Sequence, residues 1–388
     1  MIIKRKISSR LHALARQFPA LVLTGARQTG KTTLLRSEFP SHDWVSLDLP
    51  SVAEQAERDP EQFLAEHPPP IIIDEMQYAP KLFRFIKVAI DERRHDMGQY
   101  LLTGSQKFVL MREVADSLAG RAGVATLEPL SVAELGERVP EWNALLARGL
   151  YPELWRVPEA SASEFYASYV STWLERDVRQ ILNVRNLRDF ERFLRAAAVR
   201  SGQLLNLSNL ARDVGIKPHT AREWLSVLEA ANQIVLLEPY FENIGKRMVK
   251  SPKLFLSDPG LLCFLLGLDA RTLASSPLVG AVWETLVFAE LRKSIAANPA
   301  GTTASLWFYR DAEGREVDFV RADGGQLDLM EAKWTADPDA RWSRMLGDAA
   351  VRLARSPTHR IGTRMIVCRT PTVRVESGTR ITHPLDLG

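Results

Sequence analysis

The chain has 388 residues, of which 46% are hydrophobic and 25% are charged, and its formal net charge at pH 7 is +3. This composition is typical of globular proteins and excludes disordered and fibrous classes. The length predicts about two to four domains, each large enough to bury a core. The small net charge excludes a uniformly basic surface, so any contact with nucleic acid must come from a local patch.

The cysteine content and the apolar runs indicate a cytoplasmic protein. Cys263 and Cys368 lie far apart without other ligand residues nearby, so we expect reduced thiols rather than a disulfide framework or a zinc site. The basic residues 4–6 are not followed by the apolar core of a signal peptide. No apolar run reaches the length that spans a bilayer, so no membrane contact is expected.

Residues 25–32, GARQTGKT, match the phosphate-binding pattern G-x-x-x-x-G-K-[ST]. They follow the apolar run Ala20–Leu23, an expected strand, and precede an expected helix start at residues 33–36. Loop N–H groups and the helix N-terminus bind phosphate, whereas the alternative is a glycine turn without a ligand. Lys31 is expected to reach the β- and γ-phosphates of ATP, and Thr32 to bind Mg²⁺. The predicted nucleotide-binding residues are Gly25, Ala26, Arg27, Gln28, Thr29, Gly30, Lys31, Thr32 and Thr33.

Two acidic residues complete the predicted nucleotide site. After prolines 68–70, the run Ile71–Ile73 reads as a buried strand and ends in Asp74 and Glu75. Ligands of open α/β sheets bind at the carboxyl ends of strands. Asp74 is therefore the predicted Mg²⁺ partner, and Glu75 the predicted base that orients the attacking water. Another core strand is expected at residues 44–48.

Two further residues are catalytic candidates. The expected strand Tyr100–Thr103 leads to Ser105, which either contacts the γ-phosphate or belongs to an ordinary Ser/Gly turn. Arg121 precedes a fifth expected strand, Gly123–Leu127. It is either a surface charge or a finger that neutralises the transition state in a neighbouring subunit. The second interpretation implies a homo-oligomer.

The order of these motifs resembles that of bacterial and archaeal AAA-type ATPases that carry a domain of unknown function called DUF4143. The matching segments of the ATPase part are GARQTGKTTLL, SLDLPSVAEQAERDP, IIIDEMQYAPKLF, LLTGSQ and SLAGR. Those of the remaining chain are YPELW, ERDVRQI, LNLSNLARDVGI, WLSVLEA and KSPKLFLSDPGLL. The family loop usually has proline where this chain has Ala26. The resemblance implies an AAA+ core with Asp74 and Glu75 as Walker B residues and Ser105 near sensor 1.

The predicted fold class is α/β, with a P-loop AAA+ parallel-sheet ATPase core over residues 1–135. A helical lid is expected over 136–200, where Phe165, Tyr169 and Trp173 form an apolar stripe at helical spacing. A winged helix-turn-helix is expected over 201–258, since Pro218 opens a second helix after a tight turn. An α/β restriction-endonuclease-like DUF4143 domain is expected over 259–388.

The charges of the winged-helix segment limit its possible contact with DNA. From Leu205 to Ala231, the bases Arg212, Lys217 and Arg222 are balanced by Asp213, Glu223 and Glu229. A recognition helix without net charge is only weakly attracted to the phosphates that border the major groove of DNA. The expected wing, between Pro239 and Leu256, is basic. We therefore expect the wing to contact the DNA backbone and the second helix to contribute little to recognition of the base sequence. A packing module without DNA contact is the alternative. The predicted backbone contacts are Lys246, Arg247, Lys250 and Lys253.

The last domain contains a candidate nuclease patch. Residues 316–320 and 327–333 read as two strands joined at Asp323-Gly324-Gly325. A two-residue loop places Asp318 opposite Glu331 and Glu316 opposite Lys333. This arrangement resembles the PD-(D/E)xK nuclease motif, whose acids hold Mg²⁺ and whose lysine positions water. The resemblance makes Glu284, Asp318, Glu331 and Lys333 the candidate nuclease patch, whose acids would hold a second Mg²⁺ or a Mn²⁺ ion. The alternative is a Glu316–Lys333 salt bridge with the other acids solvated.

Two classes of function fit these observations. In the first, hydrolysis of Mg²⁺-ATP drives action on double-stranded DNA, with or without cleavage by the C-terminal domain. In the second, the chain is a nucleotide-dependent switch whose nuclease-like domain is inactive and binds a protein partner. A chaperone-like remodeller is a third interpretation, although no pore-loop signature is apparent.

Overall fold

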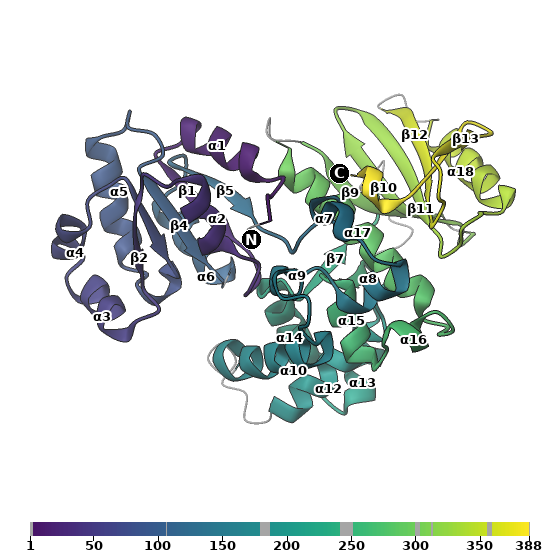
Figure 1. The fold of residues 1–388 in the computed structure, drawn as a ribbon, viewed down its shortest axis with the longest axis horizontal. Helices are drawn as coiled ribbons and strands as arrows, with labels where there is room; N and C mark the ends of the chain where they lie inside the picture. The colour runs from purple at the N-terminus through teal and green to yellow at the C-terminus, as the bar shows by residue number, and fades with distance from the viewer. Residues whose placement is uncertain are drawn as a thin grey trace. The chain divides into compact units, whose positions relative to one another are not determined.

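The computed structural model describes residues 3–105, 107–178, 187–240, 251–298, 303–311, 313–354 and 359–387. The chain forms two compact units, one consisting mainly of residues up to Leu130 and the other mainly of residues from Ser131 onward (Figure 1). The second unit contains the predicted lid, winged-helix and C-terminal segments, and the division among these three stays a prediction. No helix within the described ranges is long and apolar enough to cross a membrane.

A five-stranded parallel sheet forms the centre of the first unit, in the order β2-β3-β4-β1-β5. The strands are β1 (Ala20–Thr24), β2 (Asp43–Ser46), β3 (Ile71–Asp74), β4 (Tyr100–Gly104) and β5 (Ala122–Thr126). All five predicted strands are thus confirmed. Because β4 lies between β1 and β3, the residues that follow β4 lie between the phosphate-binding loop and the acids after β3.

Helices cover both faces of this sheet (Figure 1). They are α1 (Ser8–Gln17), α2 (Lys31–Glu38), α3 (Pro50–Arg58), α4 (Pro60–Glu66), α5 (Leu82–Glu92) and α6 (Lys107–Ser117). Along β1, Leu21 and Leu23 pack against α1 and α2, whereas Ala20 and Val22 pack against the layer of α3 to α6. Burial on both faces explains why the strands read as continuous apolar runs.

Helices on both sides of the predicted winged-helix segment in the chain belong to the second unit. They are α7 (Val132–Leu135), α8 (Trp142–Arg148), α9 (Pro152–Arg156), α10 (Ala162–Trp173), α12 (Leu187–Ala198), α15 (Pro259–Leu266) and α16 (Ala270–Leu273). A π-helical turn, Leu174–Val178, follows α10. The predicted stripe of α10 is confirmed, since Tyr169 and Trp173 are buried and Phe165 is half-buried.

Two helices and a small antiparallel sheet form the segment predicted as a winged helix. They are α13 (Leu207–Val214), α14 (Pro218–Ala230), β6 (Gln203–Leu204), β7 (Ile234–Leu237) and β8 (Lys253–Leu256). The sheet has the order β6-β8-β7, and β8 is antiparallel to both of its neighbours. Gly215 ends α13 in the left-handed conformation, with φ of 80°.

A mixed six-stranded sheet dominates the C-terminal part, in the order β13-β14-β12-β11-β10-β9. The strands of this sheet are β9 (Ser305–Arg310), β10 (Glu316–Asp323), β11 (Gln326–Ala332), β12 (Arg360–Val367), β13 (Arg374–Glu376) and β14 (Thr379–Thr382). The same part of the chain contains the helices α17 (Val279–Ala297) and α18 (Ala340–Leu353). The predicted hairpin register is confirmed: Phe319 lies opposite Met330, and Asp323 opposite Gln326. Gly324 and Gly325 both have positive φ, as a tight hairpin turn requires.

Candidate functional site

The phosphate-binding loop connects β1 to α2 and is tightly packed. A Cβ atom on Gly25 would lie 2.3 Å from the carbonyl oxygen of Leu127, so glycine is required there. Gly30, with φ of 89°, precedes the first residue of α2. The buried Lys31 ammonium donates hydrogen bonds of 3.0 Å to the carbonyls of both Gly25 and Ala26. Its charge therefore lies inside the loop, where phosphate oxygens would be bound.

The hydroxyl of Thr32 meets the carboxylate of Asp74. It donates hydrogen bonds of 2.8 and 2.9 Å to the two carboxylate oxygens. Thr103, near the end of β4, donates a further hydrogen bond to Asp74. Burial raises the pKa of Asp74, against the lowering effect of these two hydroxyl donors. A hydroxyl and a carboxylate are oxygen ligands of the kind that Mg²⁺ prefers, so this pair fits the ion that accompanies ATP.

Glu75 follows β3 in the left-handed conformation, with φ of 58°. Its carboxylate accepts hydrogen bonds from the backbone N–H and the hydroxyl of Ser105, at 3.3 and 3.2 Å, and from the amide of Gln77. Non-glycine residues with positive φ are uncommon and concentrate at functional sites. Ser105 thus lies against Glu75, the predicted base, and the contact follows from the position of β4 beside β3.

A buried arginine links the loop to the end of the sheet. The guanidinium of Arg5 donates to the carbonyl of Thr29 at 3.0 Å, to that of Glu128 at 2.6 Å and to that of Pro129 at 3.1 Å. Arg5 is only 8% exposed. The bonds connect the phosphate-binding loop to the segment that follows β5. The sequence does not reveal this role, because the acceptors are backbone carbonyls.

Other predicted nucleotide residues have more peripheral positions. Arg27 is half-buried in the loop, Gln28 is exposed with φ of 61°, and Thr33 is exposed in the first turn of α2. Arg121 makes a two-pronged ion pair with Asp91 of α5, at 2.6 and 2.9 Å. Its guanidinium is thus held within its own chain, and a role in a neighbouring subunit stays a prediction.

The predicted nuclease residues do converge, in the second unit. Lys333 lies 2.5 Å from Glu331 and 3.3 Å from Asp318. The second oxygen of Glu331 accepts the backbone N–H of Asp318 at 3.4 Å. Glu284, on α17, reaches the same cluster through Lys253. Glu316 does not pair with Lys333 as the alternative interpretation expects; it pairs with Lys253 and with Arg310 of β9.

Lys253 corrects one prediction and bears on a second. The sequence predicts that it contacts the DNA backbone, yet it is 2% exposed, so its ammonium cannot reach a phosphate outside the protein. Instead it pairs with Glu284, Glu316 and Asp318. In the described ranges, no three His, Cys, Asp or Glu side chains are grouped as a metal site, so the second metal ion expected here stays a prediction. The other expected DNA contacts, Lys246, Arg247 and Lys250, lie outside the described residues.

Burial divides the cluster acids into two kinds. It raises the pKa of Glu331 to about 8 and that of Glu284 to about 7, and in both cases the Asp318 charge adds to the rise. Burial acts on Asp318 in the same direction, but Lys333 and Lys253 outweigh it and lower the pKa of Asp318. Asp318 is therefore the carboxylate that stays ionised, and the two glutamates retain protons more readily.

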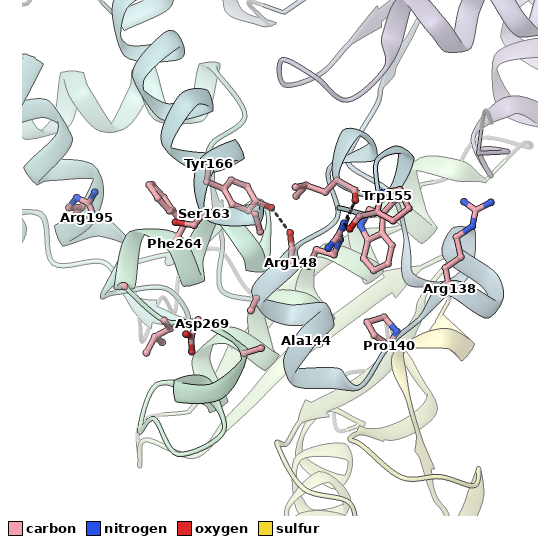
Figure 2. Close-up of a pocket in the computed structure, with 17 residues that line it drawn as sticks. Arg138, Pro140, Ala144, Arg148, Trp155, Ser163, Tyr166, Arg195, Phe264 and Asp269 are labelled. Carbon is pink, nitrogen blue, oxygen red and sulfur yellow. Dashed lines mark hydrogen bonds between the residues drawn. The ribbon is translucent and has the colours of Figure 1, made fainter. Parts of the chain in front are cut away.

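A separate cavity of about 860 Å³ lies among the helices of the second unit (Figure 2). Small residues of α8, such as Ala144 and Ala147, form part of its wall, and Trp155 and Phe264 add aromatic surface. Figure 2 shows the Tyr166 hydroxyl bonded to the carbonyl of Arg148. None of the predicted site residues lines this cavity.

Sequence reasoning misses several contacts of the two sites. Thr103 reads only as a strand residue, although its position at the end of the strand beside β3 could have identified it. Gln77 lies in the matched segment IIIDEMQYAPKLF, where the motif assigns it no role. The start of β8, a lysine followed by buried Leu254 and Phe255, could have signalled that Lys253 is internal.

Family models match three segments of the chain: an AAA domain at residues 17–136, the domain of unknown function DUF8612 at 139–272, and the domain of unknown function DUF4143 at 279–382. Uncharacterized protein Rv2008c of Mycobacterium tuberculosis and Uncharacterized protein Mb2031c of Mycobacterium bovis are each 33% identical to this chain over 358 residues. The alignment covers 92% of this chain and 79% of each relative.

Solved structures provide more distant likenesses. The Walker-type ATPase paby2304 of Pyrococcus abyssi is 17% identical, with a TM-score of 0.47, and the match covers 68% of this chain and 96% of that chain. PH0952 of Pyrococcus horikoshii, a Signal Transduction ATPase with Numerous Domains, is 13% identical, with a TM-score of 0.28, over 78% of this chain and 48% of that chain. With the AAA and DUF4143 matches and the two mycobacterial relatives, the chain belongs to the family of AAA-type P-loop ATPases that carry a C-terminal DUF4143 domain.

Proposed function

We propose that the first unit binds Mg²⁺-ATP and hydrolyses it. The observation that carries this proposal is the pair of hydrogen bonds from Thr32 to Asp74, because it joins the phosphate-binding loop to the acid expected to hold the ion. Lys31 would contact the β- and γ-phosphates, and Thr32 and Asp74 would hold Mg²⁺, which would supply positive charge to the phosphates. The chain's own contribution is to position these groups before the nucleotide binds.

Glu75 is the proposed base that orients the attacking water. Its carboxylate is the next side chain after Asp74, and Ser105 and Gln77 hold it at the end of β4. Ser105 therefore acts on hydrolysis through Glu75 as well as by any contact with the γ-phosphate. Arg121 is proposed to complete the site of a neighbouring subunit in a homo-oligomer, which requires exchange of its partner Asp91 for the nucleotide.

Action on DNA is the first candidate for what hydrolysis drives. The helix-turn-helix formed by α13 and α14 and the antiparallel sheet of β6, β8 and β7 support a winged-helix module. Because Lys253 is buried, the proposed contacts with the DNA backbone are those of Lys246, Arg247 and Lys250. In the C-terminal part, the order α17, three antiparallel strands, α18 and the parallel strand β12 supports a nuclease-like fold.

A nucleotide-dependent switch is the second candidate function. One specific observation favours it: Lys253, which is not part of the nuclease motif, lies among carboxylates that a metal-dependent nuclease would use for Mg²⁺. In this candidate the C-terminal domain cuts nothing and binds a protein partner. Fold alone does not decide between the two, because nuclease-like folds also carry other functions.

One set of assays tests both candidates. Purified wild type, Lys31→Ala and Asp318→Ala are compared for ATP turnover and plasmid integrity, with and without double-stranded DNA and with Mg²⁺ or Mn²⁺. The switch predicts turnover that is lost in Lys31→Ala, is insensitive to DNA, and is accompanied by no nicking. DNA-stimulated turnover supports the first candidate, and nicking that disappears in Asp318→Ala excludes the switch. If wild type turns over no ATP, the proposal of hydrolysis is wrong and only the proposal of nucleotide binding remains.

A further inference from the structure

The side chain of Lys253 is a buried cation with three carboxylate partners. It extends from the first residue of β8, and only 3% of it is exposed. Its ammonium lies 2.9 Å from a Glu284 oxygen, 2.5 Å from a Glu316 oxygen and 3.6 Å from an Asp318 oxygen. These acids come from α17 and β10, so a single nitrogen joins the three-stranded sheet to two elements of the C-terminal part.

The surrounding charges make this ammonium a stable cation. Burial alone would lower the pKa of Lys253, because an ammonium loses hydration in the interior. The carboxylates of Glu284, Asp318 and Glu316 outweigh burial and raise the pKa of Lys253 above its ordinary value. The ring of Phe308, whose centroid is 5.7 Å from the nitrogen, adds a cation–π contact. Lys253 thus remains charged inside the protein.

The oxygens that a metal ion would need already face protein donors. One oxygen of Asp318 faces Lys253, and the other accepts the Lys333 ammonium and the backbone N–H of Ala332, the latter at 2.9 Å. The two oxygens of Glu331 are taken by Lys333 and by the N–H of Asp318. A divalent ion binds carboxylate oxygens at about 2.0–2.6 Å, so it would have to displace an ammonium to enter.

We propose that Lys253 is the built-in counter-ion of this cluster and holds the position that a divalent metal ion would otherwise take. The inference rests on the second candidate function, since it gives the physical reason why the C-terminal domain would be inert. It also assigns the cluster a structural task, because the ammonium fastens β8 to β10 and α17. The lysine acts through its contacts with Glu284, Glu316 and Asp318.

The backbone of Lys253 holds its ammonium in a fixed position within the cluster. β8 is the middle strand of its sheet, so Lys253 lies opposite both Leu204 of β6 and Leu237 of β7. The next residues of the strand, Leu254 and Phe255, are fully buried. Withdrawal of the ammonium would therefore require disruption of the strand or a rotation of the side chain away from all three carboxylates.

Mn²⁺ binding to the nucleotide-free full chain tests the proposal, measured by the loss of the free-Mn²⁺ electron paramagnetic resonance signal. Wild type is expected to show no binding that depends on Asp318. Lys253→Met, which keeps an unbranched side chain only one atom shorter and removes the charge, is expected to bind one Mn²⁺ and to unfold at a higher temperature when Mn²⁺ is present. Adding Asp318→Asn to Lys253→Met is expected to abolish both effects.

Lys293 provides the matched control. It is also buried, at 8% exposure, but it pairs with Glu290 at a distance of 2.9 Å and lies on α17 outside the cluster. Lys293→Met removes a buried ammonium without opening a multi-carboxylate site, so it is expected to bind no Mn²⁺. A signal in this variant as strong as in Lys253→Met would mean that loss of any buried lysine creates binding, and the proposal would fail.

Two results would overturn the proposal. The first is Mn²⁺ binding by wild type that disappears in Asp318→Asn; the second is a folded Lys253→Met protein that binds none. If Lys253→Met does not fold, the Mn²⁺ titration of wild type and of Asp318→Asn still tests the proposal. The variant Lys253→Met/Glu284→Gln, which removes one positive and one negative charge, then replaces Lys253→Met. Plasmid nicking is measured separately. Failure of the second candidate function is therefore distinguished from failure of the proposed role of Lys253.

Discussion

The hydroxyl of Thr32 donates hydrogen bonds to both carboxylate oxygens of Asp74, at 2.8 and 2.9 Å. The two residues belong to α2 and β3, and β4 separates β3 from β1 in the sheet. Their contact shows that the first turn of α2 and the end of β3 converge at the carboxyl edge of the sheet. This convergence is what the proposed Mg²⁺-ATP site depends on.

Removal of the Thr32 hydroxyl should abolish most hydrolysis. Thr32→Ala deletes one proposed Mg²⁺ ligand, and we expect ATP turnover to fall about 100-fold, equivalent to about 2.7 kcal/mol of transition-state stabilisation. Thr32→Ser keeps the hydroxyl and is expected to remain near wild type. Steady-state phosphate release at saturating Mg²⁺ measures both. Equal loss in the serine variant would show that the threonine methyl, rather than the hydroxyl, matters.

Arg5 should control nucleotide affinity through the loop backbone. Arg5→Ala removes a guanidinium that bonds to Thr29, Glu128 and Pro129, and hydrogen bonds to charged groups contribute about 1.5–3 kcal/mol each. We expect the Kd for ATP to rise about tenfold, as measured by isothermal titration calorimetry. Lys4→Ala, an exposed neighbour, is the control and should not change the Kd. Wild-type affinity in a folded Arg5→Ala protein would contradict the role of Arg5.

A finger role for Arg121 can be tested by mixing subunits. Arg121→Ala should leave ATP binding intact and lower turnover by roughly 10³-fold if the guanidinium acts in a neighbouring site. A mixture of Arg121→Ala and Lys31→Ala chains should then recover activity, because some interfaces combine an intact loop with an intact arginine. Asp91→Ala is the control, since it removes only the internal partner of Arg121. Unchanged turnover in Arg121→Ala would reduce the residue to a surface ion pair.

The carboxylate cluster should make stability depend on pH. Burial and the Asp318 charge raise the pKa of Glu331 to about 8 from an ordinary 4.5, so the native state holds a proton that the unfolded state releases. The stability from this proton is complete below about pH 4.5 and is lost as the pH rises through about 8. Each tenfold difference in proton affinity between the native and unfolded states corresponds to about 1.4 kcal/mol. Glu331→Gln mimics the protonated acid and removes the part of the dependence that comes from Glu331. Urea unfolding at a series of pH values between these two limits should show wild type losing stability relative to this variant as the pH rises; parallel curves would contradict the raised pKa.

Much of the fold is legible in the sequence because its signals are local. The five strands of the first unit are continuous apolar runs, and burial on both faces explains that pattern. The C-terminal hairpin follows from Gly324 and Gly325, whose positive φ values fix the turn and hence the register that places Asp318 beside Glu331. The convergence of Asp318, Glu331 and Lys333 was therefore predictable.

The contacts that the sequence does not reveal join distant segments. Lys253 meets Glu284, Glu316 and Asp318 only because β8, α17 and β10 pack together, and nothing in the residues around Lys253 identifies those partners. Arg5 bonds to backbone carbonyls, which every residue offers. Lys253 also shows the risk of counting charges along the chain, since a basic segment can direct one of its lysines into the interior.

Glu75→Gln tests the central claim, that the first unit hydrolyses ATP with Glu75 as the base, most directly. The substitution keeps the size of the side chain and removes the carboxylate that would orient the water. Binding of ATP and its single-turnover cleavage are measured on the same preparation. We predict that Glu75→Gln retains ATP with wild-type or tighter affinity and cleaves it at least about 100-fold more slowly. Cleavage by Glu75→Gln at the wild-type rate would contradict the proposed site.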